Sequence, residues 1–400
     1  MAEFSPSQRV RSLPDNYFAN IDKRIDEFNK KGIDLIHLET GSPDQPTPYP
    51  IVRALDQASR LPGNQGYPPY GGKTNLKEAI AAFYQREYGV ALDPETEVTV
   101  FAGAQVAIAS LPQVLLDPGD VMITTDPAYP MYFSCAKLAK AKVYGIPVQE
   151  QDGFLPDYHT VPEDVVKQTK LLMLNYPNNP TGAVATEKFF SDTLDFAKEH
   201  RIPVVHDFAY AAFGFDGVRP LSFLQTPGAK DYGIEIYTMS KTYNMAGWRL
   251  GFAVGNRSII RSLSRFHDIA HSDVFGAVQD AAAAALLGPQ DCVRDLRALY
   301  ERRRNVFISN LQAIGWNVLA PAGSFFNWLK VPKGYTSETF ADTLLEQAHV
   351  AMAPGIGFGP HGDQYVRASL LEPEDRLQEA ARRIIISGVL HPLASDSLND

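Results

Sequence analysis

Seven short apolar runs in the middle of this 400-residue chain constrain its fold more than any other feature. The runs are rich in β-branched residues, and they alternate with helix-like patterns such as TEKFFSDTLDFAKEH. This composition is typical of strands buried on both faces, and the alternation predicts a parallel sheet covered by helices on both sides. The expected strands lie within residues 97–103, 121–125, 142–148, 170–176, 202–207, 234–240 and 250–255.

The pattern changes after residue 256. It predicts a long helix to about residue 287, a break at Gly288 and Pro289, and a second helix from about 289 to 314. The remainder reads as a mixture of short strands and helices. We therefore expect an α/β fold in which residues 46–289 form a large domain with a mostly parallel seven-stranded sheet flanked by helices, and residues 1–45 and 290–400 form a small α+β domain.

Composition limits the class of function. The net charge is −9 and the basic residues are scattered, so the chain shows no basic face for nucleic acid. Its two cysteines lie far apart, which favours a reducing compartment over a disulfide framework. A membrane span needs about 18 consecutive apolar residues, and no run in the sequence comes close to that length. The segment MAEFSPSQRV lacks the apolar core of a signal peptide. We expect a cytoplasmic protein with small-molecule substrates, no nucleic-acid partner and no membrane partner.

Polar side chains follow three of the expected strands. Lys241 comes directly after an apolar run in IYTMSKTYNMAGWRLG, with Arg249 as the next charge. Asp207 and Tyr210 follow another run in HDFAY, and Asn179 lies in LNYPNNPTG after a third. Because ligands of open α/β sheets collect at the carboxyl ends of strands, we expect these groups to share one edge.

Each of these groups alone has a plainer interpretation. LNYPNNPTG makes a turn in any case, Asp207 can cap a helix, and Lys241 can be a surface amine. Together they fit pyridoxal 5'-phosphate (PLP), which carries an aldehyde, a ring nitrogen and a phosphate. Lys241 can form the Schiff base, and Asp207 can keep the ring nitrogen protonated. Tyr210 and Asn179 can hydrogen-bond the phenolic oxygen, and no metal is required.

The sequence resembles the class I/II aminotransferases of PLP fold type I over nearly the whole chain. The resemblance rests on the order and spacing of Gly41 in ETGSPDQPTP, Tyr67 in GYPPYGG, the GAQ of FAGAQVA, DPAYPMY, NYPNNPTG, DFAY, SKTYNMAGWRLG, and Arg367 in YVRASL.

This resemblance implies roles for further residues. Tyr129 would stack on the cofactor ring, whose flat face suits an aromatic partner. Arg367 would hold the substrate α-carboxylate through its planar fork, with Gly41 and Asn179 as further substrate contacts. The phosphate would be bound at a helix start by Gly103, Ala104 and Gln105, together with Thr238 and Arg249.

The resemblance also implies a homodimer with shared active sites, in which Tyr67 reaches the phosphate of the neighbouring subunit. Two positions depart from the common pattern of the family. Thr238 replaces a serine and keeps the hydroxyl, whereas Gln105 replaces a smaller polar residue, so only its backbone N–H is expected to contact the phosphate.

The implied reaction moves an amino group between an L-amino acid and a 2-oxo acid, with Lys241 as the proton-transfer base, in ping-pong order. Phrases such as PAGSFFNWLKVPKGYTS resemble the methionine-salvage aminotransferases, which convert 2-oxo-4-methylthiobutyrate to methionine with glutamine or another donor. The expected walls of the side-chain pocket are the segments 13–20 and 353–363.

Other activities remain open. An aminotransferase specific for LL-diaminopimelate, alanine or aromatic amino acids, or a PLP-dependent carbon–sulfur β-lyase, would use the same cofactor residues. His267 and His271 are four apart on an expected helix, a spacing that zinc can use, but no third ligand is evident. A transcription regulator with an aminotransferase-like domain would need a DNA-binding domain, and the segment before Gly41 is too short for one.

Overall fold

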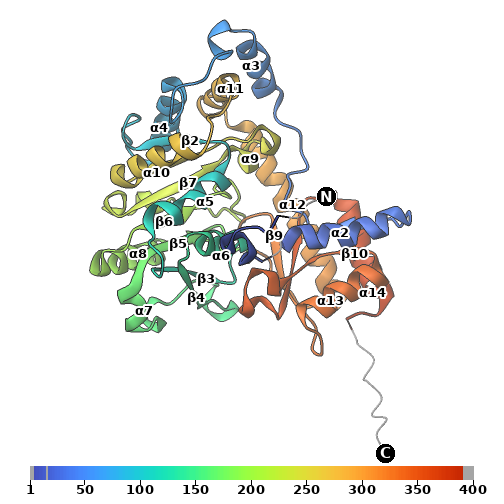
Figure 1. Ribbon diagram of the computed structural model, residues 1–400. Helices are drawn as coiled ribbons and strands as arrows, with labels where there is room; N and C mark the ends of the chain where they lie inside the picture. Colours follow the sequence, from blue (N-terminus) through green and yellow to red (C-terminus); the bar gives the residue numbers. More distant parts are fainter. Residues whose placement is uncertain (1–3, 15–16, 391–400) are drawn as a thin grey trace, which may run out of the picture.

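The computed structural model describes residues 4–14 and 17–390 (Figure 1). A seven-stranded sheet forms its larger part, and each predicted apolar run supplies one strand. The strand order is β2-β8-β7-β6-β5-β3-β4. The bounds are β2 Val98–Phe101, β3 Val121–Asp126, β4 Lys142–Pro147, β5 Thr169–Asn175, β6 Val204–Asp207, β7 Gly233–Thr238 and β8 Gly251–Gly255.

All neighbouring pairs from β7 to β4 are parallel, whereas β8 runs antiparallel to both β7 and β2. The expected mostly parallel sheet is therefore confirmed. The segment between β7 and β8 contains only the short helices Met239–Thr242 and Ala246–Trp248 and no crossover helix, so β8 returns antiparallel beside β7.

The two faces of the sheet carry separate apolar layers. In β5, Leu172 and Leu174 belong to one buried cluster, and Leu171 and Met173 belong to the other. This alternation is the two-residue period of a strand buried on both sides. Helices α4 Thr74–Tyr88, α8 Glu187–His200 and α11 Gly276–Leu287 contribute to the first cluster, and α5 Ala104–Leu115, α6 Pro130–Leu138 and α10 Arg257–Ala270 to the second.

One helix prediction was wrong. Instead of a single helix to about residue 287, the chain forms α10 and α11, with an interruption at residues 271–275. The local capping groups explain the start of α10, where the Asn256 side chain accepts hydrogen bonds from the Ser258 and Ile259 N–H groups. The apolar stretch that continues into α11 hides the break from a periodicity argument.

A second unit packs beside the sheet and holds its own buried cluster. It contains an antiparallel sheet, β11-β12-β9, and a short parallel pair of β1 with β10. Its elements are α2 Tyr17–Lys30, β1 Ile36–His37, α12 Asp291–Ala313, β9 Phe326–Lys330, α13 Ser337–Thr343, β10 Val350–Ala351, β11 Ala353–Pro354, β12 Tyr365–Ser369 and α14 Glu374–Ser387. In Figure 1 this unit lies to the right of the large sheet, so the two can enclose a site between them. Within the described part of the chain, no helix is long and apolar enough to cross a bilayer.

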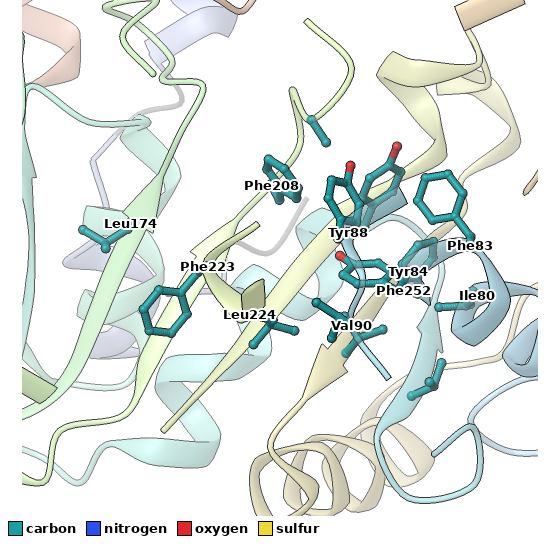
Figure 2. Packing of buried hydrophobic residues seen from close by; sticks show 14 of the residues in the cluster. Ile80, Phe83, Tyr84, Tyr88, Val90, Leu174, Phe208, Phe223, Leu224 and Phe252 are labelled. Carbon is teal, nitrogen blue, oxygen red and sulfur yellow. The ribbon is translucent and has the colours of Figure 1, made fainter. Parts of the chain in front are cut away.

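Aromatic rings fill the first cluster. Figure 2 shows Phe83, Tyr84 and Tyr88 of α4 beside Phe252 of β8. Phe252 is fully buried and stacks on Tyr237, with ring centroids 5.1 Å apart. These rings join α4 to the strands beneath it.

Replacing Phe252 with alanine should lower the free energy of unfolding by about 3–5 kcal/mol, because it leaves a cavity in a close-packed layer. Urea unfolding followed by circular dichroism measures this change. Leu319→Ala is the control, since Leu319 is 58% exposed and its loss should cost within about 0.5 kcal/mol. A cost below about 1 kcal/mol for Phe252→Ala would contradict the packing described.

Candidate active site

A cavity of about 290 Å³ lies where the carboxyl ends of the central strands face the second unit. The structure brings most of the predicted site residues together in it. Those that line the cavity are Gly41, Ala104, Gln105, Tyr129, Asn179, Asp207, Tyr210, Thr238, Lys241, Arg249 and Arg367. Gly103 directly precedes Ala104 in the chain but is not part of the lining, and neither is Tyr67.

Lys241 lies on the short helix α9, Met239–Thr242, which follows β7. Its Nζ donates a hydrogen bond to the Gly41 carbonyl oxygen at 2.5 Å. Burial, together with the cations Arg367 and Arg249, lowers the pKa of this amine to about 8, and Asp207 opposes that shift. The amine is therefore neutral at a pH where an exposed lysine is still charged.

Asp207 ends β6 with its carboxylate buried. Its Oδ2 accepts a hydrogen bond from the Tyr132 hydroxyl at 2.6 Å, and its Oδ1 accepts one from the Ala209 N–H at 3.2 Å. Burial raises the pKa of this carboxyl, and the bond from Tyr132 opposes the rise. A buried carboxylate of this kind is stabilised by a cation or proton donor placed against it.

Two asparagines connect Asp207 to the opposite wall. Asn175, at the end of β5, donates to the Asp207 carbonyl oxygen at 2.7 Å and accepts from the Asn179 N–H at 2.8 Å. The Asn179 Oδ1 accepts a hydrogen bond from Arg367 Nη1 at 3.1 Å. The loop LNYPNNPTG is thus tied by side chains on both sides, so Asn179 has a fixed position.

Arg367 of β12 is only 2% exposed. Its Nη2 donates to the Glu39 carbonyl oxygen at 2.6 Å, and its guanidinium carbon lies 4.1 Å from the centre of the Phe326 ring and 5.0 Å from that of Phe358. Burial lowers the pKa of this group to about 10. Its Nε is buried and has no hydrogen-bond partner among the described residues. The Arg367 Nε is therefore free to donate a hydrogen bond to a carboxylate ligand, while Nη2 stays bonded to Glu39.

The other end of the cavity suits an anion. Helix α5 begins at Ala104, and its N-cap residue Gly103 provides no side-chain cap, so the first N–H groups remain available. Gly103 has a φ of +93°, and a Cβ there would lie 2.5 Å from Arg249 Nη2. Glycine therefore permits both the turn and the close approach of Arg249. The Thr238 hydroxyl accepts from the Ser240 N–H at 3.1 Å, which leaves its own proton to donate.

Tyr129 and Tyr210 supply rings to the cavity. Tyr129 is the N-cap residue of α6, and burial raises its pKa to about 12. Tyr210 is packed edge-on against Phe325 and Phe326, with centroids 5.2 and 5.7 Å away, and burial raises its pKa as well. Both hydroxyls therefore keep their protons and can act as donors.

Tyr67 is fully exposed and takes no part in the cavity of its own chain. Tyr49 and Tyr70 are also largely exposed. The segment after Tyr67 is held by an ion pair between Lys73 Nζ and Asp280 Oδ1 at 2.6 Å. Tyr67 is thus presented outward from an anchored loop.

Several lining residues were not predicted individually. Tyr132 and Asn175 lie inside DPAYPMY and LNYPNNPTG, so the motifs contained them, but only the fold shows that both contact Asp207. Phe18 of α2 comes from the expected wall 13–20, of which residues 15 and 16 fall outside the described residues. Phe326 had no signal that separates it from a core residue.

The histidine pair gives no support to the metal alternative. His267 is buried on α10 against the Phe101 ring, whereas His271 lies just past the end of that helix. In the ranges that the structure covers, no group of three or more histidine, cysteine, aspartate or glutamate side chains could hold a metal ion.

The chain is similar to known aminotransferases over nearly its whole length. The family model for aminotransferase class I and II matches residues 33–384. An L-glutamine–4-(methylsulfanyl)-2-oxobutanoate aminotransferase of Bacillus subtilis (strain 168) is 54% identical over 96% of both chains. An LL-diaminopimelate aminotransferase of Moorella thermoacetica (strain ATCC 39073 / JCM 9320) is 43% identical over 94% of this chain and 97% of its own. The solved structure of substrate-bound BacF from Bacillus subtilis has a TM-score of 0.92 and 44% identity, covering 96% of this chain and 98% of that one.

The lowered pKa of Lys241 predicts unusual reactivity. The rate at which cyanate carbamylates Lys241 in the protein without added cofactor should rise with pH and level off above about pH 8, because only the neutral amine reacts. Peptide mass spectrometry measures the rate, with the amine of Lys188, whose side chain is 83% exposed, as the internal control. A Lys241 rate that still rises through pH 9.5 would contradict the role of burial.

Proposed function

Because this chain belongs to the aminotransferase class I and II family, we propose that it transfers the amino group of L-glutamine to 2-oxo-4-methylthiobutanoate, with PLP as cofactor. The match over residues 33–384 makes the protein an aminotransferase, which acts on an amino acid and a 2-oxo acid. The family depends on PLP. The relative that is 54% identical supports the choice of donor and acceptor.

The residues present fit this cofactor at three points. Lys241 offers a buried amine for the aldehyde, and Asp207 offers a carboxylate that gains stability from a protonated ring nitrogen. The uncapped start of α5 with Gly103 and Arg249 forms a cradle that a Cβ at Gly103 would fill. When bound, PLP supplies an aldehyde that joins amines and a cationic ring that withdraws electrons from the substrate Cα.

The residues of the chain then have distinct tasks. Asp207, held by Tyr132, keeps a proton on the ring nitrogen, and Tyr129 covers the face of the ring. Arg367 and Asn179 orient the substrate through its α-carboxylate, for which the Arg367 Nε is free. Lys241, whose lowered pKa raises the fraction of neutral amine, would take the proton from the substrate Cα and return it. Arg249, Thr238 and the start of α5 hold the phosphate.

The proposed side-chain specificity rests on the charges that line the cavity. The charged residues of the lining are Asp207, Lys241, Arg249 and Arg367, and each already has a task. The described lining thus offers no further charge for a substrate with a second ammonium and carboxylate, such as LL-diaminopimelate. The rings of Phe18, Phe326 and Phe358 around Arg367 instead suit an apolar thioether.

We also propose a homodimer, in which the exposed Tyr67 completes the phosphate site of the partner subunit. The exposure of Tyr49, Tyr67 and Tyr70, which lie in one stretch of the chain, supports this arrangement. The proposed location is the cytoplasm, which the free cysteines Cys135 and Cys292 fit. The domain boundaries expected from the sequence remain part of the proposal.

A second candidate is a PLP-dependent β-lyase, because the cofactor residues would be the same. One experiment separates the two: the protein with PLP is offered L-glutamine, L-alanine, L-tyrosine, LL-diaminopimelate and a cysteine S-conjugate, each with and without several 2-oxo acids. Methionine should form from 2-oxo-4-methylthiobutanoate at least about tenfold more efficiently than glutamate forms from 2-oxoglutarate, since an unpaired buried carboxylate costs about 1–3 kcal/mol. Lys241→Ala should lower the rate at least about a hundredfold.

Preference for LL-diaminopimelate, or release of pyruvate and a thiol from a cysteine conjugate without amino transfer, would overturn the proposed specificity or reaction. Liquid chromatography with mass spectrometry follows all products in one assay.

Shared sites predict complementation between two inactive variants. Tyr67→Ala should weaken cofactor binding in the partner site, and Lys241→Ala should remove the amine. Refolding the two together should give hybrid dimers in which one site carries both changes and the other carries neither. Activity should rise several-fold above either variant alone; activity equal to the average of the two would contradict shared sites.

A further inference from the structure

A cluster of polar side chains with no exposure to solvent lies directly behind Asp207. Its centre is His206, which precedes Asp207 on β6, and Glu235, which is its neighbour on β7. Both side chains are 0% exposed. Successive residues of a strand point to opposite faces, so His206 points away from the cavity that Asp207 enters. Neither residue lines that cavity.

The hydrogen bonds of His206 indicate which of its ring nitrogens carry a proton. Its Nε2 lies 2.8 Å from the Tyr176 carbonyl oxygen, which can only accept, so this nitrogen carries a proton. Its Nδ1 lies 2.8 Å from Glu235 Oε1. The protonation of Nδ1 therefore depends on whether Glu235 is a carboxylate.

Three other donors point at Glu235. The Phe223 N–H donates to Oε1 at 2.6 Å, and the Ser222 and Tyr84 hydroxyls donate to Oε2 at 2.8 and 3.1 Å. Tyr84 and Phe223 both belong to the first apolar cluster, and Figure 2 shows their rings. The Ser222 oxygen also accepts from the Leu224 N–H at 3.1 Å, so its own proton is directed at Glu235. A group that accepts from every neighbour is best satisfied as a carboxylate.

We propose that His206 and Glu235 form a buried imidazolium–carboxylate pair that keeps Asp207 ionised, which makes both positioning residues for the cofactor ring. The proposal rests on the proposed function only in assigning Asp207 to the ring nitrogen. The charge on His206 is a property of the protein itself.

The neighbourhood of Asp207 gives the pair its effect. Burial raises the pKa of Asp207, and the charge of His206 lowers it, as do the Tyr132 hydroxyl and Lys241. Removing the cation should let Asp207 take up a proton at higher pH, which would leave the ring nitrogen without its anionic partner. The titratable groups around the pair and Asp207 are Tyr84, Tyr88, Tyr129, Tyr132, Tyr210, Tyr237 and Lys241.

Neutron diffraction from crystals of the unsubstituted protein in D₂O near pH 7 tests the charge directly. We expect deuterium on both ring nitrogens of His206 and none on either Glu235 oxygen. A single deuterium on the ring, with Glu235 carrying the other, would show a neutral pair and overturn the proposal. This result does not depend on any activity.

The pH dependence of kcat/KM tests the positioning role. His206→Asn should lower kcat at least about tenfold and move the acidic limb of the profile upward by about one pH unit, since a nearby charge shifts a pKa by about 1–3 units. The double variant His206→Asn, Glu235→Gln should move the same limb in the same direction while leaving no unpaired buried charge.

His267→Asn is the matched control, because His267 is also fully buried but does not line the cavity. The acidic limb of the kcat/KM profile of this variant should lie at the same pH as that of the unsubstituted protein, even if the melting temperature of the variant is lower. An unchanged limb in a folded His206 variant would overturn the positioning role, and if neither His206 variant folds, the neutron result decides.

Failure of the proposed function has a different signature. If the unsubstituted protein transfers no amino group with any substrate pair, the assignment of Asp207 to the ring nitrogen is wrong. The neutron map still decides whether His206 is charged.

Discussion

Burial of charge in one cavity is the constraint on which the rest of this structure depends. Asp207 and Arg367 are removed from water and Lys241 is partly so, and a charge in protein costs several kcal/mol when it has no partner. The chain meets this cost with hydrogen bonds from fixed neighbours, and through a lowered pKa at the amine. The same conditions lower the pKa of one amine and leave one carboxylate ready for a cation.

The fold explains how these groups meet. The parallel strands β5, β6 and β7 end at one edge of the sheet. Asn175 lies beside Asp207 there, and Thr238 lies two residues beyond Ile236, which is the neighbour of Asp207 on β7. The second unit then places Arg367 on the opposite wall, and Asn179 bonds across to it. The sheet edge alone, or the second unit alone, would leave its charged groups exposed to water. The site therefore forms only where the two units meet.

The sequence predicted the sheet well because strands buried on both faces leave uninterrupted apolar runs, and each run held a strand. It predicted much of the cavity for a related reason: Lys241, Asp207 and Asn179 lie at the ends of such runs or shortly after them. The break between α10 and α11 was missed because apolar periodicity continues across it. Tyr132 and Phe326 were missed because an aromatic residue that contacts a site looks the same in sequence as one that fills a core. The interaction of His206 with Glu235 joins two strands, and the spacing of the sequence does not show it.

The central claim is that Lys241, among all the lysines of the chain, is the amine that joins the cofactor. Borohydride reduction of the protein loaded with PLP, followed by digestion and peptide mass spectrometry, tests it most directly. The account predicts one pyridoxyl phosphate group per chain, on the peptide that contains Lys241. A label on another lysine, or a label spread over several exposed lysines, would contradict it.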